Sequence, residues 1–210
     1  VTWISPHRLD PYRPLERIDE NRQVTAETKP IVISASLPDR FERNHARVGE
    51  MIDAYRKHAP ASVKNFPSML TEGDKAAYFQ AGREYKFQGT IIDSGCFVGG
   101  TTISLIEGLR ANPLTAANAD KLQGLIRVYD LFSIDDDYIL RHLQENYPNR
   151  TFETGGSFQS TFEDNLAEHA AWIDLRAGDV IERGYPEGKP IEIFGVDLCK
   201  ALPVTDAVIR

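Results

Sequence analysis

Short apolar runs alternate with helix-periodic segments along the second half of the chain. The runs are rich in Ile, Val and Leu, and they occupy 90–92, 125–129, 172–175 and 191–196. Segments whose apolar residues recur with a helical period lie at 103–110, 135–146 and 158–170. Strands that alternate with helices predict a parallel sheet wrapped in helices. The predicted fold class is therefore α/β, with a doubly wound parallel sheet.

The first part of the chain has a different pattern. Residues 1–27 are rich in Pro, Arg and Asp and show little periodicity, which indicates an extended arm that packs on another element or a linker from an upstream domain. A short β-like run follows at 30–34. The apolar positions after it predict one helix over 38–59 and a second helix over 71–86.

The balance of charge changes close to the end of these helices. Residues 1–70 carry 11 basic and 9 acidic side chains, whereas residues 71–210 carry 13 and 22. We therefore predict two parts, an N-terminal arm with a mainly helical extension over 1–66 and an α/β domain over 67–210.

The overall composition limits the class of partner. The chain has a formal net charge of -7 and 41% hydrophobic residues, which is typical of a globular protein. An acidic chain lacks the basic face that nucleic-acid binding needs, and no apolar run approaches the ~20 residues of a membrane helix. With two cysteines, the chain has no disulfide framework. We expect a cytoplasmic protein that binds neither nucleic acid nor membranes.

The turn after the apolar run at 90–92 carries the strongest chemical signal. Asp93 ends the strand, and the loop that follows has the spacing Gly95-x-x-x-Gly99-Gly100 before a predicted helix. Glycines let a ligand approach the backbone, and N–H groups at a helix start receive negative or polar groups. The spacing is neither G-x-G-x-x-G nor that of a P-loop, which disfavours NAD and P-loop nucleotides. Asp93 would repel a pyrophosphate but suits an amino group. A tight turn without a ligand is the alternative.

Three more aspartates follow the other predicted strands, at Asp130, Asp179 and Asp197. The carboxyl ends of parallel strands meet at one edge of a sheet, where ligands bind. Asp130 could accept hydrogen bonds from the two hydroxyls of a ribose, and Asp179 could accept one from an exocyclic adenine amine. Asp197 could bind a metal, water or substrate. Each alone is more typical of a helix cap or a solvated turn. Four strand ends that all terminate in Asp favour a binding site.

The segments 93–102, 128–132, 177–180 and 194–197 together resemble class I S-adenosylmethionine-dependent methyltransferases. Their order is most similar to that of the macrocin O-methyltransferase family. In that family the first loop reads acidic-x-Gly-x-x-x-Gly-Gly-Ser/Thr, which the first of these segments matches. Asp130 and Phe132 match an aspartate two residues before a phenylalanine. The resemblance covers about 67–210 and implies a Rossmann-like sheet.

The resemblance implies a site for S-adenosylmethionine. The cofactor's amino group would lie near Asp93, its ribose at Asp130, Phe132 beside the nucleoside, and adenine by Asp179. The candidate cofactor-binding residues are Asp93, Gly95, Cys96, Phe97, Gly99, Gly100, Thr101, Thr102, Asp130, Phe132, Gly178 and Asp179. We interpret Cys96 as a small packing residue rather than a nucleophile.

The resemblance also implies an O-methyltransferase that acts on a small-molecule hydroxyl, such as that of a sugar or a glycosylated natural product. This hydroxyl must lose a proton, to a general base or at a divalent metal. Relatives use Mg²⁺ held by carboxylates, and Asp197 matches the first of these ligands. Asp197 is therefore the predicted catalytic and metal-binding residue. Cys199 stands where the family commonly has a second acidic residue.

Two other functions stay open. One is a non-catalytic, methyltransferase-like binding or scaffold module within a larger protein, which fits Cys199 in place of an acidic residue. The other is an NAD-linked enzyme, which the glycine spacing disfavours.

The predicted sheet is smaller than the family's, because only four of its seven strands fit within 67–210. Residues 204–210 read as the start of a helix. The strand 191–196 would then expose an unpaired edge, which soluble proteins avoid. We expect that the chain is a fragment of a longer protein, or that a second copy or an adjoining domain covers this edge.

Overall fold

The computed structural model describes residues 2–4, 37–185 and 190–197. The elements in chain order are β1 (Thr2–Ile4), α1 (Leu37–His58), α2 (Ala61–Lys64), α3 (Glu72–Glu84), β2 (Thr90–Ser94), α4 (Gly100–Arg110), the 3₁₀ helix η1 (Ala116–Lys121), β3 (Ile126–Asp130), α5 (Asp137–Asn146), α6 (Gln159–Asn165), the 3₁₀ helix η2 (Ala167–Trp172), β4 (Ile173–Ala177), α7 (Val180–Arg183) and β5 (Ile191–Val196).

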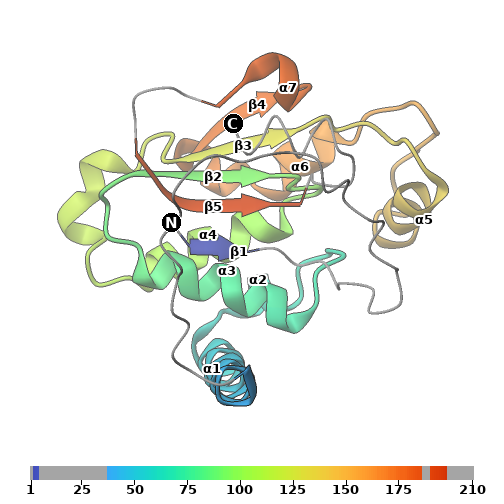
Figure 1. Cartoon of the computed structure of the whole chain (residues 1–210). Coiled ribbons are helices and arrows are strands. Elements are labelled where there is room, and N and C mark those ends of the chain that lie inside the picture. The colour runs from blue at the N-terminus through green and yellow to red at the C-terminus, as the bar shows by residue number, and fades with distance from the viewer. Residues whose placement is uncertain (1, 5–36, 186–189, 198–210) are drawn as a thin grey trace, which may run out of the picture.

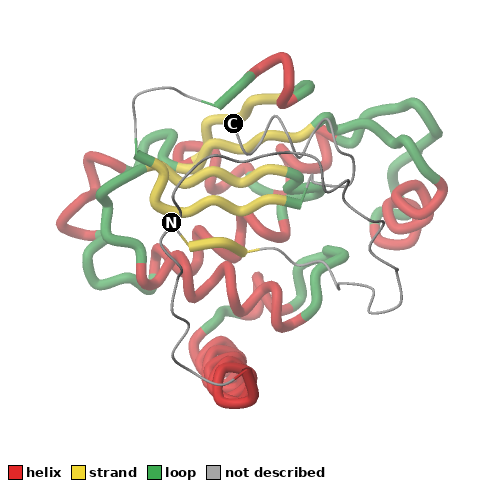
Figure 2. Tube along the Cα trace, in the orientation of Figure 1, coloured by secondary structure: helices red, strands yellow, loops and turns green. Residues whose placement is uncertain are grey.

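A five-stranded sheet in the order β1-β5-β2-β3-β4 forms the centre of the molecule (Figures 1 and 2). Every neighbouring pair of strands is parallel, so the predicted α/β class with a parallel sheet is confirmed. From β2 the chain adds β3 and β4 on one side and then returns to place β5 on the other. This reversal is compatible with a Rossmann-like sheet, and it creates a topological switch point between β2 and β5.

One face of the sheet is covered by α3 and α4, and the backbones of these two helices approach each other closely where they cross. A Cβ atom on Gly108 would lie 2.1 Å from the carbonyl oxygen of Phe79, and one on Gly82 would lie 2.4 Å from that of Leu105. The two glycines therefore bring the helix backbones into direct contact. This pair of helices sits on Ile91, Val128 and other inward residues in the main hydrophobic core.

The other face carries a smaller apolar cluster. Ile92 and Tyr129 from the sheet and Val180 from α7 are buried there, and Tyr185 and Phe194 pack against them. β2 contributes to both clusters because successive side chains point to opposite faces. Burial on both faces explains why this strand reads as a nearly continuous apolar run.

The prediction that 191–196 has an unpaired edge is wrong for this structure. β1 pairs in parallel with β5, with Thr2 opposite Ile193 and Ile4 opposite Gly195. The extended arm predicted at the N-terminus therefore supplies a strand to the sheet (Figure 1). A three-residue strand is too short to show a period of two, which is why the pattern of the sequence did not reveal it.

Residues on both sides of the predicted boundary at position 66 share one core. Tyr55 on α1 and Val63 on α2 are buried with residues of the sheet domain, and the rings of Tyr55 and Phe79 meet edge-on at 5.8 Å. In Figure 1, α1 is seen end-on below α3. The buried ammonium of Lys75 donates to the carbonyl oxygens of Val63, Lys64 and Phe66, which fastens α2 to α3.

Most predicted helices are present, with one correction. The segment 158–170, predicted as a single helix, is divided into α6 and η2 at Leu166, whose backbone leaves the helical region. The strand-like run at 30–34 and the helix start at 204–210 lie outside the described residues. No helix in the described part of the chain is long and apolar enough to cross a membrane.

Candidate functional site

The ends of β2, β3, β4 and β5 are held level by three hydrogen bonds, whose donors lie one residue beyond β2, β4 and β5. The N–H of Gly95 donates to Tyr129 O at 2.8 Å, that of Gly178 to Asp130 O at 2.9 Å, and that of Asp197 to Ser94 O at 2.8 Å. The segments that bear the four predicted aspartates therefore meet at one edge of the sheet. In Figure 1 the arrowheads of the strands point toward this edge.

Asp93 is the most deeply buried of these four aspartates, at 1% exposed. Its Oδ2 accepts from Thr101 Oγ1 at 2.8 Å and from Thr102 Oγ1 at 2.6 Å, both on the first turn of α4. Its Oδ1 is also buried and has no hydrogen-bond partner among the described residues. Burial raises the pKa of this carboxyl to about 6, the two threonines oppose the rise, and Asp130 and Asp197 add to it.

The glycine-rich loop connects β2 to α4 through strained backbone. Gly99 precedes α4 with a φ of 104°, and Phe97 has a φ of 52°, which is costly for a residue with a side chain. A Cβ atom on Gly99 would lie 2.8 Å from Leu166 Cδ1. Glycine is therefore required at this position by both conformation and space.

Asp130 holds this loop with its carboxylate. Its Oδ2 accepts from the N–H of Phe97 at 2.9 Å, and its Oδ1 accepts from the N–H of Phe132 at 2.8 Å. Phe132 also has a positive φ, 54°, so two strained residues direct their N–H groups at one carboxylate. Asp130 is 9% exposed. The residue predicted to bind ribose hydroxyls thus binds the protein's own loop in this conformation.

The aromatic and sulfur side chains of the loop region point into the core. Phe132 is 1% exposed and packs against Phe158 and Phe162, at ring separations of 5.5 and 5.3 Å. Phe97 packs against Phe158 at 5.1 Å. Cys96 is buried, and its burial together with Asp130 and Asp93 raises the pKa of its thiol, so the thiol stays protonated and inert.

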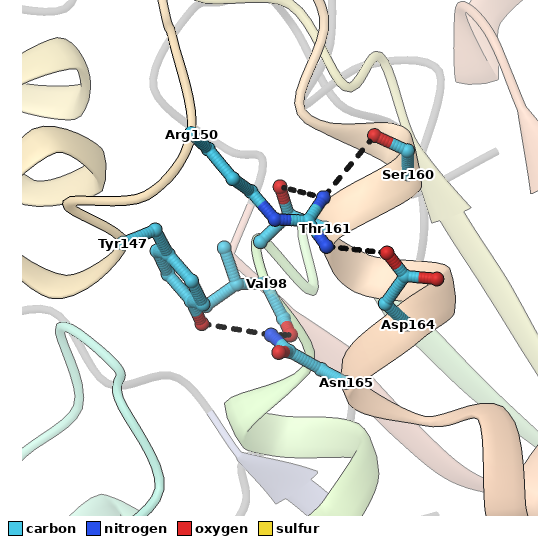
Figure 3. A network of polar contacts seen from close by, with 7 residues as sticks. All are labelled: Val98, Tyr147, Arg150, Ser160, Thr161, Asp164 and Asn165. Carbon is cyan, nitrogen blue, oxygen red and sulfur yellow. Dashed lines mark hydrogen bonds and ion pairs between the residues drawn. The ribbon is translucent and has the colours of Figure 1, made fainter.

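A polar network ties the loop to α6, as Figure 3 shows. The amide of Asn165 donates to Val98 O at 3.0 Å and to Tyr147 Oη at 2.7 Å. Beside it, Arg150 donates to Thr161 Oγ1 and forms an ion pair with Asp164. These contacts cross-link the segment that follows α5, helix α6 and the glycine-rich loop.

The remaining predicted residues lie near this edge without forming a metal centre. Gly178 has a φ of 121°, and a Cβ atom on it would lie 3.1 Å from Arg183 Nε. Asp179 directly precedes α7. In the part of the chain that the structure describes, no group of three or more His, Cys, Asp or Glu side chains could hold a metal ion. Cys199 lies outside that part. Asp197 therefore has no described donor set with which to bind Mg²⁺.

Two residues of this region were not identified from the sequence. The hydroxyls of Tyr78 on α3 and of Ser68 are buried and have no hydrogen-bond partner in the described structure. Ser68 lies against Gly100, where a Cβ atom would come within 2.6 Å of the serine Cβ. Neither residue stands out in the sequence, because both reach the site by packing of the segment 67–84 on the sheet.

The described cavities lie elsewhere. One of about 360 Å³ is lined by Tyr55, Arg56, Glu72 and their neighbours, and one of about 290 Å³ lies at the opposite end of the strands, beside Thr90, Gly124 and Arg127. In the first, Arg56 is already paired with Glu72 at 2.7 Å. The carboxyl edge is taken as the candidate site because buried oxygens of Asp93, Tyr78 and Ser68 there have no partner among the described residues.

Comparisons with known proteins add no relative. No model of a protein family matches the chain, and neither the curated proteins nor the solved structures yield a match. The likeness to methyltransferases therefore rests on the motifs of the sequence.

Proposed function

We propose that this chain binds S-adenosylmethionine and transfers a methyl group to the hydroxyl of a small molecule. The acceptor class we propose is a sugar or a glycosylated natural product, following the resemblance of the motifs. The observation that carries the proposal is the buried Oδ1 of Asp93 at the switch point between β2 and β5, which has no hydrogen-bond partner in the part of the chain that the structure describes. A buried carboxylate oxygen without a partner is costly, and a ligand that donates to it removes this cost.

Different residues position the two parts of the proposed ligand site, the carboxyl of Asp93 and the glycine-rich loop. Thr101 and Thr102 fix the carboxyl of Asp93 through Oδ2 and leave Oδ1 to receive an amino group. Asp130 and Asn165 fix the backbone of the glycine-rich loop. The cofactor would supply an electrophilic methyl group, so the protein has mainly to align it with the acceptor.

Asp197 is the proposed acceptor of the proton that the hydroxyl loses. It follows β5 at the switch point, next to the end of β2, to which its N–H is bonded. No step in this proposal uses Mg²⁺, because the described residues provide no donor set for it.

Calorimetric titration of the folded protein with S-adenosylmethionine and S-adenosylhomocysteine tests the proposal. We expect both to bind, NAD not to bind, and Asp93→Asn to weaken the binding of both. A folded sample that binds neither ligand would overturn the proposal. Binding of NAD alone would favour an NAD-linked enzyme instead.

A second candidate is a methyltransferase-like module that binds without catalysis. The observation that favours it is that both oxygens of the Asp130 carboxylate accept hydrogen bonds from backbone N–H groups of the protein itself. Cofactor binding without methyl transfer to any member of a panel of sugars and glycosides would favour this candidate. Transfer to one of them would exclude it.

A further inference from the structure

The hydroxyl of Tyr78 lies at the candidate site although its helix precedes the motif-bearing region. Tyr78 is 0% exposed, and its Oη is buried without a hydrogen-bond partner among the described residues. Its ring packs on the backbone of β5, where a Cβ atom on Gly195 would lie 2.7 Å from Cε1 and 3.3 Å from Oη. Gly195 stands directly opposite Asp93 in the ladder between β5 and β2.

The surroundings of this hydroxyl are negative. Burial raises the pKa of Tyr78, and the charges of Asp93, Asp197 and Asp74 raise it further, so the phenol stays protonated. The hydroxyl keeps a lone pair that can accept a hydrogen bond. An anionic ligand group would be repelled by these carboxylates, whereas a cationic group would be attracted.

Three oxygen atoms at this end of β2 thus lack described partners: Tyr78 Oη, Asp93 Oδ1 and Ser68 Oγ. Ser68 lies against Gly100, the residue before the two threonines that bond Asp93. Native proteins rarely leave a buried polar atom unpaired, so each such atom calls for an explanation, and a group that binds there in use is one. An ammonium group has three N–H donors and needs acceptors of this kind.

We propose that Tyr78 Oη, Asp93 Oδ1 and Ser68 Oγ together form a subsite for the primary ammonium group of an amino-acid-bearing ligand. This inference rests on the proposed function and assigns Tyr78 to the recognition of the ligand. The hydroxyl accepts from the ammonium, while Asp93 supplies the opposite charge. Tyr78 thereby distinguishes ligands that carry the amine from those that lack it.

The test compares two ligands on three proteins by calorimetry. The ligands are S-adenosylhomocysteine and its deaminated analogue, which keeps the carboxylate but lacks the amine. The proteins are the wild type, Tyr78→Phe and Tyr55→Phe. Tyr55 is the matched control, because it is also a buried tyrosine whose hydroxyl has no partner in the described structure, but it lies between α1 and α3.

We expect Tyr78→Phe to weaken the binding of S-adenosylhomocysteine about tenfold, as loss of a hydrogen bond to a charged group does. The affinity for the deaminated analogue should stay unchanged. Tyr55→Phe should change neither affinity. If Tyr78→Phe weakens both ligands equally or neither, the inference is overturned while the proposed function stands. If the wild type binds neither ligand, the proposed function itself fails.

Thermal unfolding of the ligand-free proteins gives a second measurement. Replacing an unpaired buried hydroxyl by hydrogen removes a desolvation cost, so Tyr78→Phe should raise the melting temperature. A hydroxyl that only supports the fold would give the opposite change. A lower melting temperature for Tyr78→Phe, with unchanged ligand affinity, would therefore contradict the proposed role.

Discussion

At the scale of single residues, Asp93 has the clearest energetic consequence. Its pKa is raised to about 6 from an ordinary value of 3.8, mainly because burial disfavours the charged form. The folded protein therefore holds this proton more tightly than the unfolded chain does. The stabilisation from this group is fully present below about pH 4 and is lost as the pH rises through about 6.

We predict that Asp93→Asn removes this pH dependence. Between pH 5 and pH 7 the free energy of unfolding of the wild type should fall by about 1 kcal/mol more than that of the variant. Urea denaturation at the two pH values measures the difference. Asp120→Asn, a change at an exposed carboxyl, is the control and should follow the wild type. Equal pH responses of wild type and Asp93→Asn would show that this carboxyl is already ionised at pH 5.

At the scale of elements, the crossing of α3 and α4 sets the position of Asp93's partners. Thr101 and Thr102 lie on α4, and Tyr78 lies on α3, so both helices contribute to the candidate site. Their contact depends on Gly82 and Gly108. A side chain at either position would clash with backbone atoms of the facing helix, which can move only if the whole helix moves. The geometry of the site is therefore sensitive to a methyl group on Gly108, about two turns along α4 from Thr101 and Thr102.

We predict that Gly108→Ala destabilises the protein by about 3 kcal/mol or more, although alanine is the better helix former. The new Cβ would lie 2.1 Å from Phe79 O, so the helices must separate. Gly73→Ala in the first turn of α3 is the control, because its Cβ would make ordinary contacts at 3.7 and 3.9 Å. This variant should be neutral or stabilising by up to about 1 kcal/mol.

Urea denaturation of both alanine variants tests this prediction. Similar stabilities for Gly108→Ala and Gly73→Ala would show that the crossing tolerates a methyl group. The helices would then have to be free to separate, which would contradict the close packing described above.

The elements also show what the sequence can predict. The strands β2 and β5 were predicted because burial on both faces leaves a run of apolar residues. The helix predicted over 158–170 is interrupted at Leu166, whose side chain lies against Gly99. The side chain of Asn165, the last residue of α6, donates to Val98 O. Such contacts between distant segments leave no periodic signal. Predictions from local pattern therefore find the elements but miss their interruptions.

The same reasoning applies to the candidate site. The positions of Asp93 and Asp130 at one edge follow from parallel strands and could be predicted. The partners of Asp130 could not, because they are backbone N–H groups directed by the positive φ of Phe97 and Phe132. The place of Tyr78 depends on how α3 packs against β5, which the sequence of neither segment reveals.

At the scale of the whole molecule, β1 protects the edge of β5. A strand with an unpaired edge is a template for pairing with another chain. The pairing of Thr2–Ile4 with β5 supplies this protection within the chain. The described sheet then ends in β1 on one side and β4 on the other.

We predict that a variant beginning at residue 5 is less stable and self-associates. Loss of about 1–2 kcal/mol should lower the melting temperature by a few degrees in a chain of this size. Light scattering over a range of concentrations should show a rising mass, because β5 is exposed. A variant that lacks Val1 alone is the control. Unchanged mass and melting temperature for the longer deletion would contradict the role of β1.

The pairing of β1 with β5 also sets an order for folding during synthesis. Thr2 is opposite Ile193, so nearly the whole described chain must leave the ribosome before these two strands can meet. Contacts between such distant residues form slowly, because a long loop has to close first. β2, β3 and β4 can assemble earlier, since they follow one another in the chain. β1 precedes the other described strands in the chain and is thus among the last to join the sheet, so the edge of β5 is open to pairing with other chains until β1 reaches it.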